Sequence, residues 1–163
     1  AAGTLTTDKS VRLFEKFGIF TKAELISREE IIYETYAKTL NIEALTMINM
    51  ANKKIIPAVI RYSKSLADTV IAVKDAGADA SVQRDILNTV SSKLITAKNA
   101  LLRLEEATAQ AGNIKSAKDK AFFYKDTVKV EMDALRKPVD ELELVVDKSM
   151  WPMPTYGDLT FEV

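Results

Sequence analysis

The amino-acid sequence predicts an all-α protein: an antiparallel bundle of three long helices, preceded by a short N-terminal helix and followed by an irregular C-terminal tail. Only five Gly and four Pro occur in 163 residues, which leaves few positions for turns. Apolar residues recur at steps of three or four, as on the buried face of a helix. No stretch long enough for a strand alternates between apolar and polar residues. We therefore expect few, long helices in a single domain over residues 1–163.

The N-terminal part contains signals for the first two helices. A short helix over 9–17 is expected to end at Gly18, because glycine readily adopts the left-handed conformation that follows a helix. Thr21 and Glu24 have the spacing of a capping box, in which each side chain accepts from the backbone N–H of the other residue. These residues predict the start of a long helix over 21–76.

The helix over 21–76 is predicted mainly from its apolar period. Forty residues separate the ends of its apolar stripe and contain eleven steps, or about 3.6 residues per step, which is the period of a straight α-helix. Pro57 lacks a backbone N–H and crowds the carbonyl of Lys53, so we expect a bend there. The stripe consists of positions 33, 36, 40, 44, 47, 51, 55, 59, 62, 66, 70 and 73.

The third long helix is expected over 79–112, with Asp79 or Ser81 as its N-cap. Gly77 and Gly112 permit tight connections on either side, so consecutive long helices should run antiparallel. The predicted stripe consists of positions 82, 86, 90, 94, 97, 101 and 104.

The fourth helix is expected over 113–148, opening at Asn113 and bending at Pro138. The segment 149–163 is rich in Pro and aromatic residues and is predicted to be irregular. The stripe of the fourth helix consists of positions 114, 117, 121, 124, 128, 132, 135, 139, 142 and 146.

Unequal helix lengths predict an apolar overhang. The helix over 21–76 would span roughly 80 Å and the next one roughly 50 Å, so residues 21–41 extend beyond their antiparallel neighbour. Either the short first helix or another chain or domain must cover the apolar side chains there. The interface candidates in this segment are Ile32, Tyr33, Tyr36 and Leu40.

The tail over 149–163 concentrates apolar side chains in a segment without regular structure. Left free, such a segment would promote aggregation, so we expect it to dock on its own bundle or on another domain. The interface candidates in the tail are Trp151, Met153, Tyr156 and Phe161.

Composition excludes several functions. Basic and acidic side chains balance at 23 each, so neither nucleic acid nor an anionic membrane surface is an expected partner. The longest uncharged stretches have nine residues, such as Ala44–Asn52, and a membrane-spanning helix needs roughly twenty. No signal peptide is recognisable, and we expect a cytoplasmic protein.

No catalytic, cofactor or metal site is predicted within the chain. The sequence has no Cys, no His and no glycine-rich phosphate-binding loop. The aromatic cluster at 122–124 could stack bases, but core packing is the preferred interpretation. Paired acids could bind a hard cation through oxygen, although solvated helix faces explain them more simply. These pairs are Glu29/Glu30, Glu105/Glu106 and Glu141/Glu143.

Three stretches carry a resemblance to a known family. They are VRLFEKFGIFTKAELIS at 11–27, NIEALTMINMANKKIIPAVIRY at 41–62, and VEMDALRKPVDELELVVD from 130, followed by the closing WPMPTYGDLTFEV. In these stretches the chain resembles the C-terminal helical region of type III glutamine synthetases, with a looser match over 77–120.

The resemblance implies a larger parent enzyme, an ATP-dependent glutamate–ammonia ligase that uses Mg or Mn and assembles as a ring-based homo-oligomer. It places the catalytic, nucleotide and metal residues in preceding domains, so the expected partners are the preceding catalytic domain and other subunits. We expect a non-catalytic domain that supports folding or oligomer assembly. A regulatory or partner-binding helical module is the alternative, and an unrelated helical scaffold is a third reading if the resemblance fails.

Overall fold

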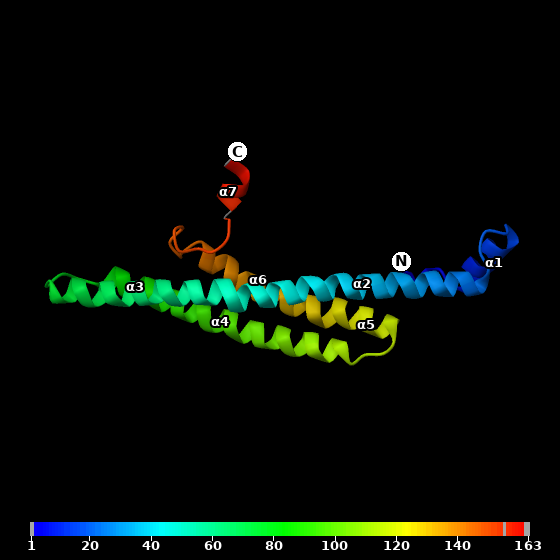
Figure 1. Cartoon of the computed structure of the whole chain (residues 1–163), viewed down its shortest axis with the longest axis horizontal. Coiled ribbons are helices and arrows are strands. Elements are labelled where there is room, and N and C mark those ends of the chain that lie inside the picture. The colour runs from blue at the N-terminus through cyan, green and yellow to red at the C-terminus, as the bar shows by residue number, and fades with distance from the viewer. Residues whose placement is uncertain (1, 155, 162–163) are drawn as a thin grey trace. The chain divides into compact units, whose positions relative to one another are not determined.

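The computed structural model describes residues 2–154 and 156–161. Within these residues every regular element is helical and no strand occurs, which confirms the all-α prediction (Figure 1). Two of the predicted interface side chains, Tyr156 and Phe161, lie outside the side chains that the structure describes.

The elements follow one another with short connections. In chain order they are η1 (Ala2–Thr4), α1 (Asp8–Lys16), α2 (Lys22–Met50), the π-helix η2 (Ala51–Ile55), α3 (Ile56–Asp75), α4 (Ser81–Gly112), α5 (Ala117–Phe123), the π-helix η3 (Tyr124–Val128), α6 (Lys129–Glu143) and α7 (Tyr156–Phe161).

The chain divides into two compact units, each built from segments distant in sequence. Unit 1 consists of Ala1–Leu45 and Ala107–Val130, and unit 2 consists of Thr46–Glu106 and Glu131–Val163. The single domain expected over 1–163 stays a prediction.

Two glycines end helices as the sequence predicts. Gly18 has a φ of 62°, and Gly77 has a φ of 77°. After α1, the N–H of Ile19 bonds the carbonyl of Phe14 at 2.9 Å, and the N–H of Gly18 bonds that of Glu15 at 3.0 Å. This pair of bonds is the Schellman motif, and it recurs at Gly77 after α3.

The capping box at the start of α2 forms as predicted. The backbone N–H of Thr21 donates to Oε2 of Glu24 at 2.7 Å, and the N–H of Glu24 donates to Oγ1 of Thr21 at 3.3 Å. The bond from the Thr21 backbone is the largest cause that lowers the pKa of Glu24 below its ordinary value.

The helix predicted over 21–76 is helical throughout 22–75, but one turn of it is wider than an α-helix. In η2 the N–H of Ile56 bonds the carbonyl of Ala51, five residues back. This π-turn directly precedes Pro57, which has no N–H for the carbonyl of Lys53. The bends expected at Pro57 and Pro138 stay predictions.

The start of the helix predicted over 113–148 differs in the structure. Asn113 does not open it: its side-chain amide donates to the carbonyl of Ala109 at 3.5 Å, at the end of α4. Ser116 is the N-cap of α5, because its hydroxyl accepts from the N–H of Asp119 at 3.3 Å.

The end of this helix also differs, since α6 stops at Glu143 rather than at Lys148. Beyond it, Oδ1 of Asp147 accepts from the N–H of Ser149 at 2.7 Å, which gives the backbone a local alternative to helical bonds. The tail predicted to be irregular contains the short helix α7.

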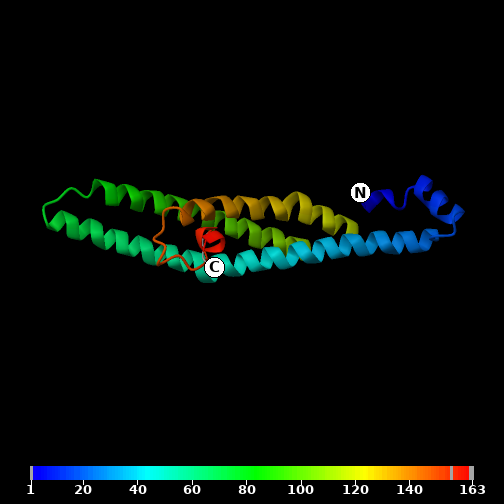
Figure 2. The same cartoon turned by 90° about the horizontal axis from the view of Figure 1, so that it is seen from above.

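Unit 1 packs α5 and η3 against α2. Tyr124 is buried, and its hydroxyl donates to Oδ1 of Asn41 at 2.9 Å. The rings of Tyr33 and Phe122 lie 6.2 Å apart, and the two helices run side by side in both views (Figures 1 and 2). Part of the segment 21–41 is therefore covered by the fourth predicted helix, whereas the short first helix or another chain or domain was expected to cover it.

Unit 2 packs leucine side chains from α4 and α6. Lys93 pairs with Glu141, and Nε of Arg103 lies 2.9 Å from Oε2 of Glu131, so α4 and α6 run antiparallel in this unit. The chain also reverses between α3 and α4 (Figure 2). The largest fully buried side chains of unit 2 are Leu101, Leu104, Leu135, Leu142, Val59 and Val90.

The capping box generates a pH-dependent prediction. Because the pKa of Glu24 is lowered in the folded chain, its contribution to stability is present above the ordinary value of 4.5 and is lost as pH falls through the lower, folded pKa. We expect Glu24→Gln to lower the denaturant midpoint at pH 7 and to have little effect once the wild-type carboxyl is protonated. A midpoint difference that stays constant from pH 7 to pH 2 would contradict the prediction.

Candidate functional site

Apart from Leu40, the described interface candidates lie on two surfaces, one in each unit. We call the first the aromatic patch, formed by Ile32, Tyr33, Tyr36 and Phe122 of unit 1. The second is the tail pocket of unit 2, formed by helices and by the tail that contains Trp151 and Met153.

The aromatic patch is an exposed apolar surface carried by α2 and α5. Ile32 and Tyr36 are four residues apart on α2, so their side chains share one helix face, and they are 45% and 39% exposed. Phe122 of α5 is also exposed, and Nζ of Lys125 lies 5.8 Å from the centre of its ring. The patch therefore presents large apolar side chains to solvent beside one cation.

The N-terminal segment fixes one edge of this patch. Thr6 donates a hydrogen bond to the buried carboxylate of Glu29, which also accepts from the hydroxyl of Tyr33. Partial burial raises the pKa of Tyr33, and the neighbouring charge of Glu29 raises it further. A Cβ at Gly3 would lie 3.2 Å from the Tyr33 hydroxyl, so a larger residue there would press on this ring.

Leu40 does not belong to the exposed surface, contrary to its selection as an interface candidate. It lies in the core of unit 1 with Ala37 and Ala44. These residues are spaced by three and four positions, so they share a helix face. Tyr36 lies one turn before Leu40, at the edge of that face, and is exposed.

Sequence reasoning missed several exposed apolar residues of unit 1. Phe122 was assigned to core packing, but only Tyr124 of its cluster is buried. Leu13 on α1 and Phe17, the C-cap of this helix, are exposed, whereas Val11 is buried. At about 100° per residue the first two lie opposite Val11, so the helical period could have separated the two faces.

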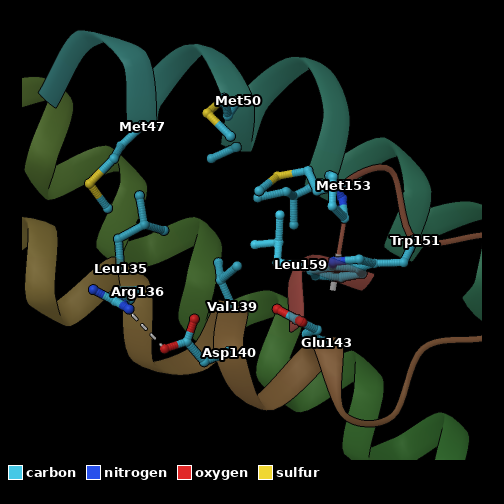
Figure 3. A pocket seen from close by; sticks show the side chains of 13 residues that line it. Met47, Met50, Leu135, Arg136, Val139, Asp140, Glu143, Trp151, Met153 and Leu159 are labelled. Atoms are coloured by element: carbon cyan, nitrogen blue, oxygen red, sulfur yellow. Dashed lines mark hydrogen bonds and ion pairs between the residues drawn. The ribbon is translucent and has the colours of Figure 1, made fainter. Parts of the chain in front are cut away.

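The tail pocket is a largely apolar cavity of about 370 Å³ in unit 2 (Figure 3). Side chains from the end of α2, η2 and α6 form one part of its wall, and the tail forms the other. The apolar side chains around it are Met47, Met50, Ala51, Ile55, Leu135, Val139, Trp151, Met153, Pro154 and Leu159. The tail thus docks on helices of its own chain, which was one of the two alternatives predicted.

Trp151 is the most buried described residue of the tail, with 7% of its surface exposed. Its indole Nε1 is buried and has no hydrogen-bond partner within the described chain. Met153 is half-buried and also lines the pocket, whereas Leu159 is largely exposed.

Three charged residues of α6 border the tail pocket. Nε of Arg136 lies 3.3 Å from Oδ2 of Asp140, one helical turn further on (Figure 3). Glu143, which is half-buried, adds a second carboxylate to the lining. This part of the lining therefore carries one positive and two negative groups.

The acidic pairs do not assemble into a site. Glu29 is buried against Thr6, Glu105 accepts from the side chain of Asn52 at 2.6 Å, and Glu141 pairs with Lys93. Among the described residues, no group of three or more acids is placed to hold a metal ion. None of the described helices combines the length and the apolar composition of a bilayer span.

Comparison with known proteins indicates the family. The profile of a family described as the glutamine synthetase C-terminal domain matches residues 1–74. A glutamine synthetase of Butyrivibrio fibrisolvens is 34% identical over 159 residues, which cover 96% of this chain and 23% of that protein. The chain therefore resembles the C-terminal region of glutamine synthetases along most of its length, and its residues 1–74 match the family profile.

Two further relatives agree with this resemblance. A type-3 glutamine synthetase of Dictyostelium discoideum is 28% identical over 99% of this chain, and a glutamine synthetase of Bacteroides fragilis is 26% identical over 88% of it. The resemblance to type III glutamine synthetases is confirmed. The chain spans 20–23% of the length of these three relatives. Ile32 and Tyr36 lie within the profile match, whereas Phe122 and Trp151 lie beyond it.

Docking of the tail predicts a large stability difference between two apolar truncations. Trp151→Ala should lower the free energy of unfolding by about 3 kcal/mol, because it removes a buried aromatic side chain from the pocket wall. Leu144→Ala is the control: this side chain is 87% exposed, so its loss should change stability by less than about 0.5 kcal/mol. Urea unfolding followed by circular dichroism measures both, and equal effects would contradict docking of the tail.

Proposed function

We propose that this segment is a non-catalytic domain that supports folding or oligomer assembly of a glutamine synthetase. The observation that carries the proposal is the aromatic patch. The large apolar side chains of Ile32, Tyr36 and Phe122 are exposed on unit 1. Packing against another protein surface would remove them from water, which is favourable. The resemblance to glutamine synthetases supplies the larger protein in which another surface can cover them.

The parent enzyme in this proposal makes glutamine from glutamate, ammonia and ATP, with Mg or Mn as its divalent metal. Its catalytic, nucleotide-binding and metal-binding residues belong to other domains. The partners of this segment are the preceding catalytic domain and other subunits of a cytoplasmic homo-oligomer. The relatives' names, and the share of their length that this chain spans, support the proposal.

The finer architecture is part of the same proposal: one antiparallel bundle of three long helices with bends at Pro57 and Pro138. The antiparallel register of α4 and α6 in unit 2 supports it. The π-turn η2 beside Pro57 supports the first of the two bends, because π-turns and prolines are common causes of helix kinks.

The assembly role is tested by placing a charge in the aromatic patch of the whole enzyme. Ile32→Glu should weaken subunit or domain association by about 3 kcal/mol, roughly a hundredfold, because the interface would bury an unpaired carboxylate. Sedimentation velocity of the enzyme over a dilution series measures the effect. The unfolding midpoint of the 163-residue chain should stay unchanged, since Ile32 is already exposed in it.

Ile71→Glu is the matched control. Ile71 lies on α3 of unit 2 and is 59% exposed, comparable to Ile32, but it belongs to neither candidate surface. Normal assembly and turnover of the Ile32→Glu enzyme, or the same loss in both variants, would count against a role for the aromatic patch.

A regulatory or partner-binding module is the second candidate function, and the tail pocket favours it. Its volume of about 370 Å³ falls in the range of small-molecule sites, and the tail forms part of its wall. In this alternative, binding of an effector changes how the tail is held. An effector of the enzyme should then raise the unfolding temperature of the wild-type chain, and an effector that leaves this temperature unchanged would argue against the alternative.

A further inference from the structure

We propose that the tail pocket binds a small, uncharged, largely apolar molecule whose polar end is an oxygen that accepts a hydrogen bond from Trp151. The inference concerns unit 2 alone and does not depend on the assembly role proposed for the aromatic patch. Four properties of the pocket support it: its lining, an indole N–H without an acceptor in the described part of the chain, the poor fit of a water molecule, and the charged side chains around it.

The lining favours an apolar body of variable shape. Met47, Met50 and Met153 contribute three of its side chains, and methionine adapts its flexible thioether to irregular ligands. Leu135 and Val139 provide branched apolar walls on α6. The volume of about 370 Å³ exceeds what one or two missing methyl groups would leave in a core and is suited to a compact ligand.

The indole N–H of Trp151 supplies the polar contact. Trp151 is more than nine-tenths buried, lines the cavity, and has no acceptor for its Nε1 within the described chain. Figure 3 shows the Trp151 side chain among the others that line the pocket. A buried donor without a partner costs free energy, so an oxygen acceptor placed there is favoured.

A water molecule is a poor occupant of this position. Buried waters typically make about three hydrogen bonds, and cavities lined by apolar side chains stay dry. Besides the Trp151 indole, the polar side chains of the pocket are Arg136, Asp140 and Glu143, of which Arg136 and Asp140 already pair with each other. A molecule with one oxygen on an apolar body matches a single donor in an apolar wall better than water does.

Charge in the lining selects against anions. Arg136 is held by Asp140, and the half-buried Glu143 adds a second carboxylate to the lining. A ligand carboxylate could accept from Trp151 but would meet two acids for one base, and an ammonium group offers the indole no acceptor. A ketone, ester or amide oxygen satisfies Trp151 without adding charge.

The test uses the 163-residue chain, in which Trp151 is the sole tryptophan and gives one indole resonance in a ¹⁵N correlation spectrum. The probes are heptan-2-one, heptane and heptanoate, which share a chain length and differ in their polar end. We expect heptan-2-one to shift the indole proton downfield with saturation. Heptane should perturb the methyl resonances of the lining methionines without that shift, and heptanoate should bind about tenfold more weakly than heptan-2-one.

Two variants separate the hydrogen bond from the apolar contact. Trp151→Phe keeps an aromatic ring but removes the donor, so affinity for heptan-2-one should fall about fivefold while affinity for heptane stays within about twofold, measured on the methionine methyl groups. Glu143→Gln removes charge from the lining and should raise the affinity for heptanoate alone. The second variant keeps the test valid if Trp151→Phe perturbs folding.

Four results would overturn the proposal. The first is no saturable change with any probe, and the second is an equal indole shift with heptane. The third is an indole proton that resonates downfield without ligand and moves upfield in Glu143→Gln. This result would mean that the Trp151 N–H already donates to Glu143. The fourth is an indole shift that depends on chain concentration, which would place a second copy in the pocket. None of these bears on subunit assembly, which the variants of Ile32 test separately.

Discussion

The structure depends on one constraint: each long helix buries only a narrow stripe, and much of that stripe is alanine. The buried positions of α2, η2 and α3 include Ala37, Ala44, Ala51 and Ala58, and α4 adds further alanines. Small side chains permit close packing of helices but remove little apolar area from water. Larger side chains must therefore complete each core, and those that lie off the stripe are left exposed. The excess of exposed apolar surface follows from this geometry.

The π-turns show how the narrow stripe is kept on one face. Positions 47, 51, 55 and 59 advance by four residues each, so in an α-helix the stripe would rotate by about 40° per step. The wider turn η2 lies within this run, and Ala51, Ile55 and Val59 are all buried. The same holds for η3, where Tyr124 and Val128 are buried. Each π-turn therefore offsets the rotation of the buried stripe that steps of four residues would cause in an α-helix.

Much of the fold was predictable because its signals are local, as with the glycines after α1 and α3 and the capping box at Thr21. The π-turns were not. Steps of four also occur from Val82 to Leu94, yet α4 has no π-turn and Val82 is exposed, so equal spacing has two structural outcomes. For the candidate sites, unequal helix lengths led to the selection of Ile32 and Tyr36, and the aromatic composition of the tail led to that of Trp151. The contact of Phe122 with Tyr33 joins helices far apart in sequence, which spacing within one helix cannot predict.

The two units differ in whether their exposed apolar side chains are covered by the chain itself. The proposed assembly role and the proposed ligand binding rest on this difference. In unit 2 the tail folds against the helices, so Trp151 and Met153 help to form a pocket in which the Trp151 indole N–H has no acceptor among the described residues. A pocket with few polar groups suits a small molecule. In unit 1, Ile32, Tyr36 and Phe122 stay exposed as a patch next to Lys125, a surface that suits a broad protein contact better than a small ligand. The proposed assembly role therefore rests on unit 1 and the proposed ligand binding on unit 2, and either proposal can fail without the other.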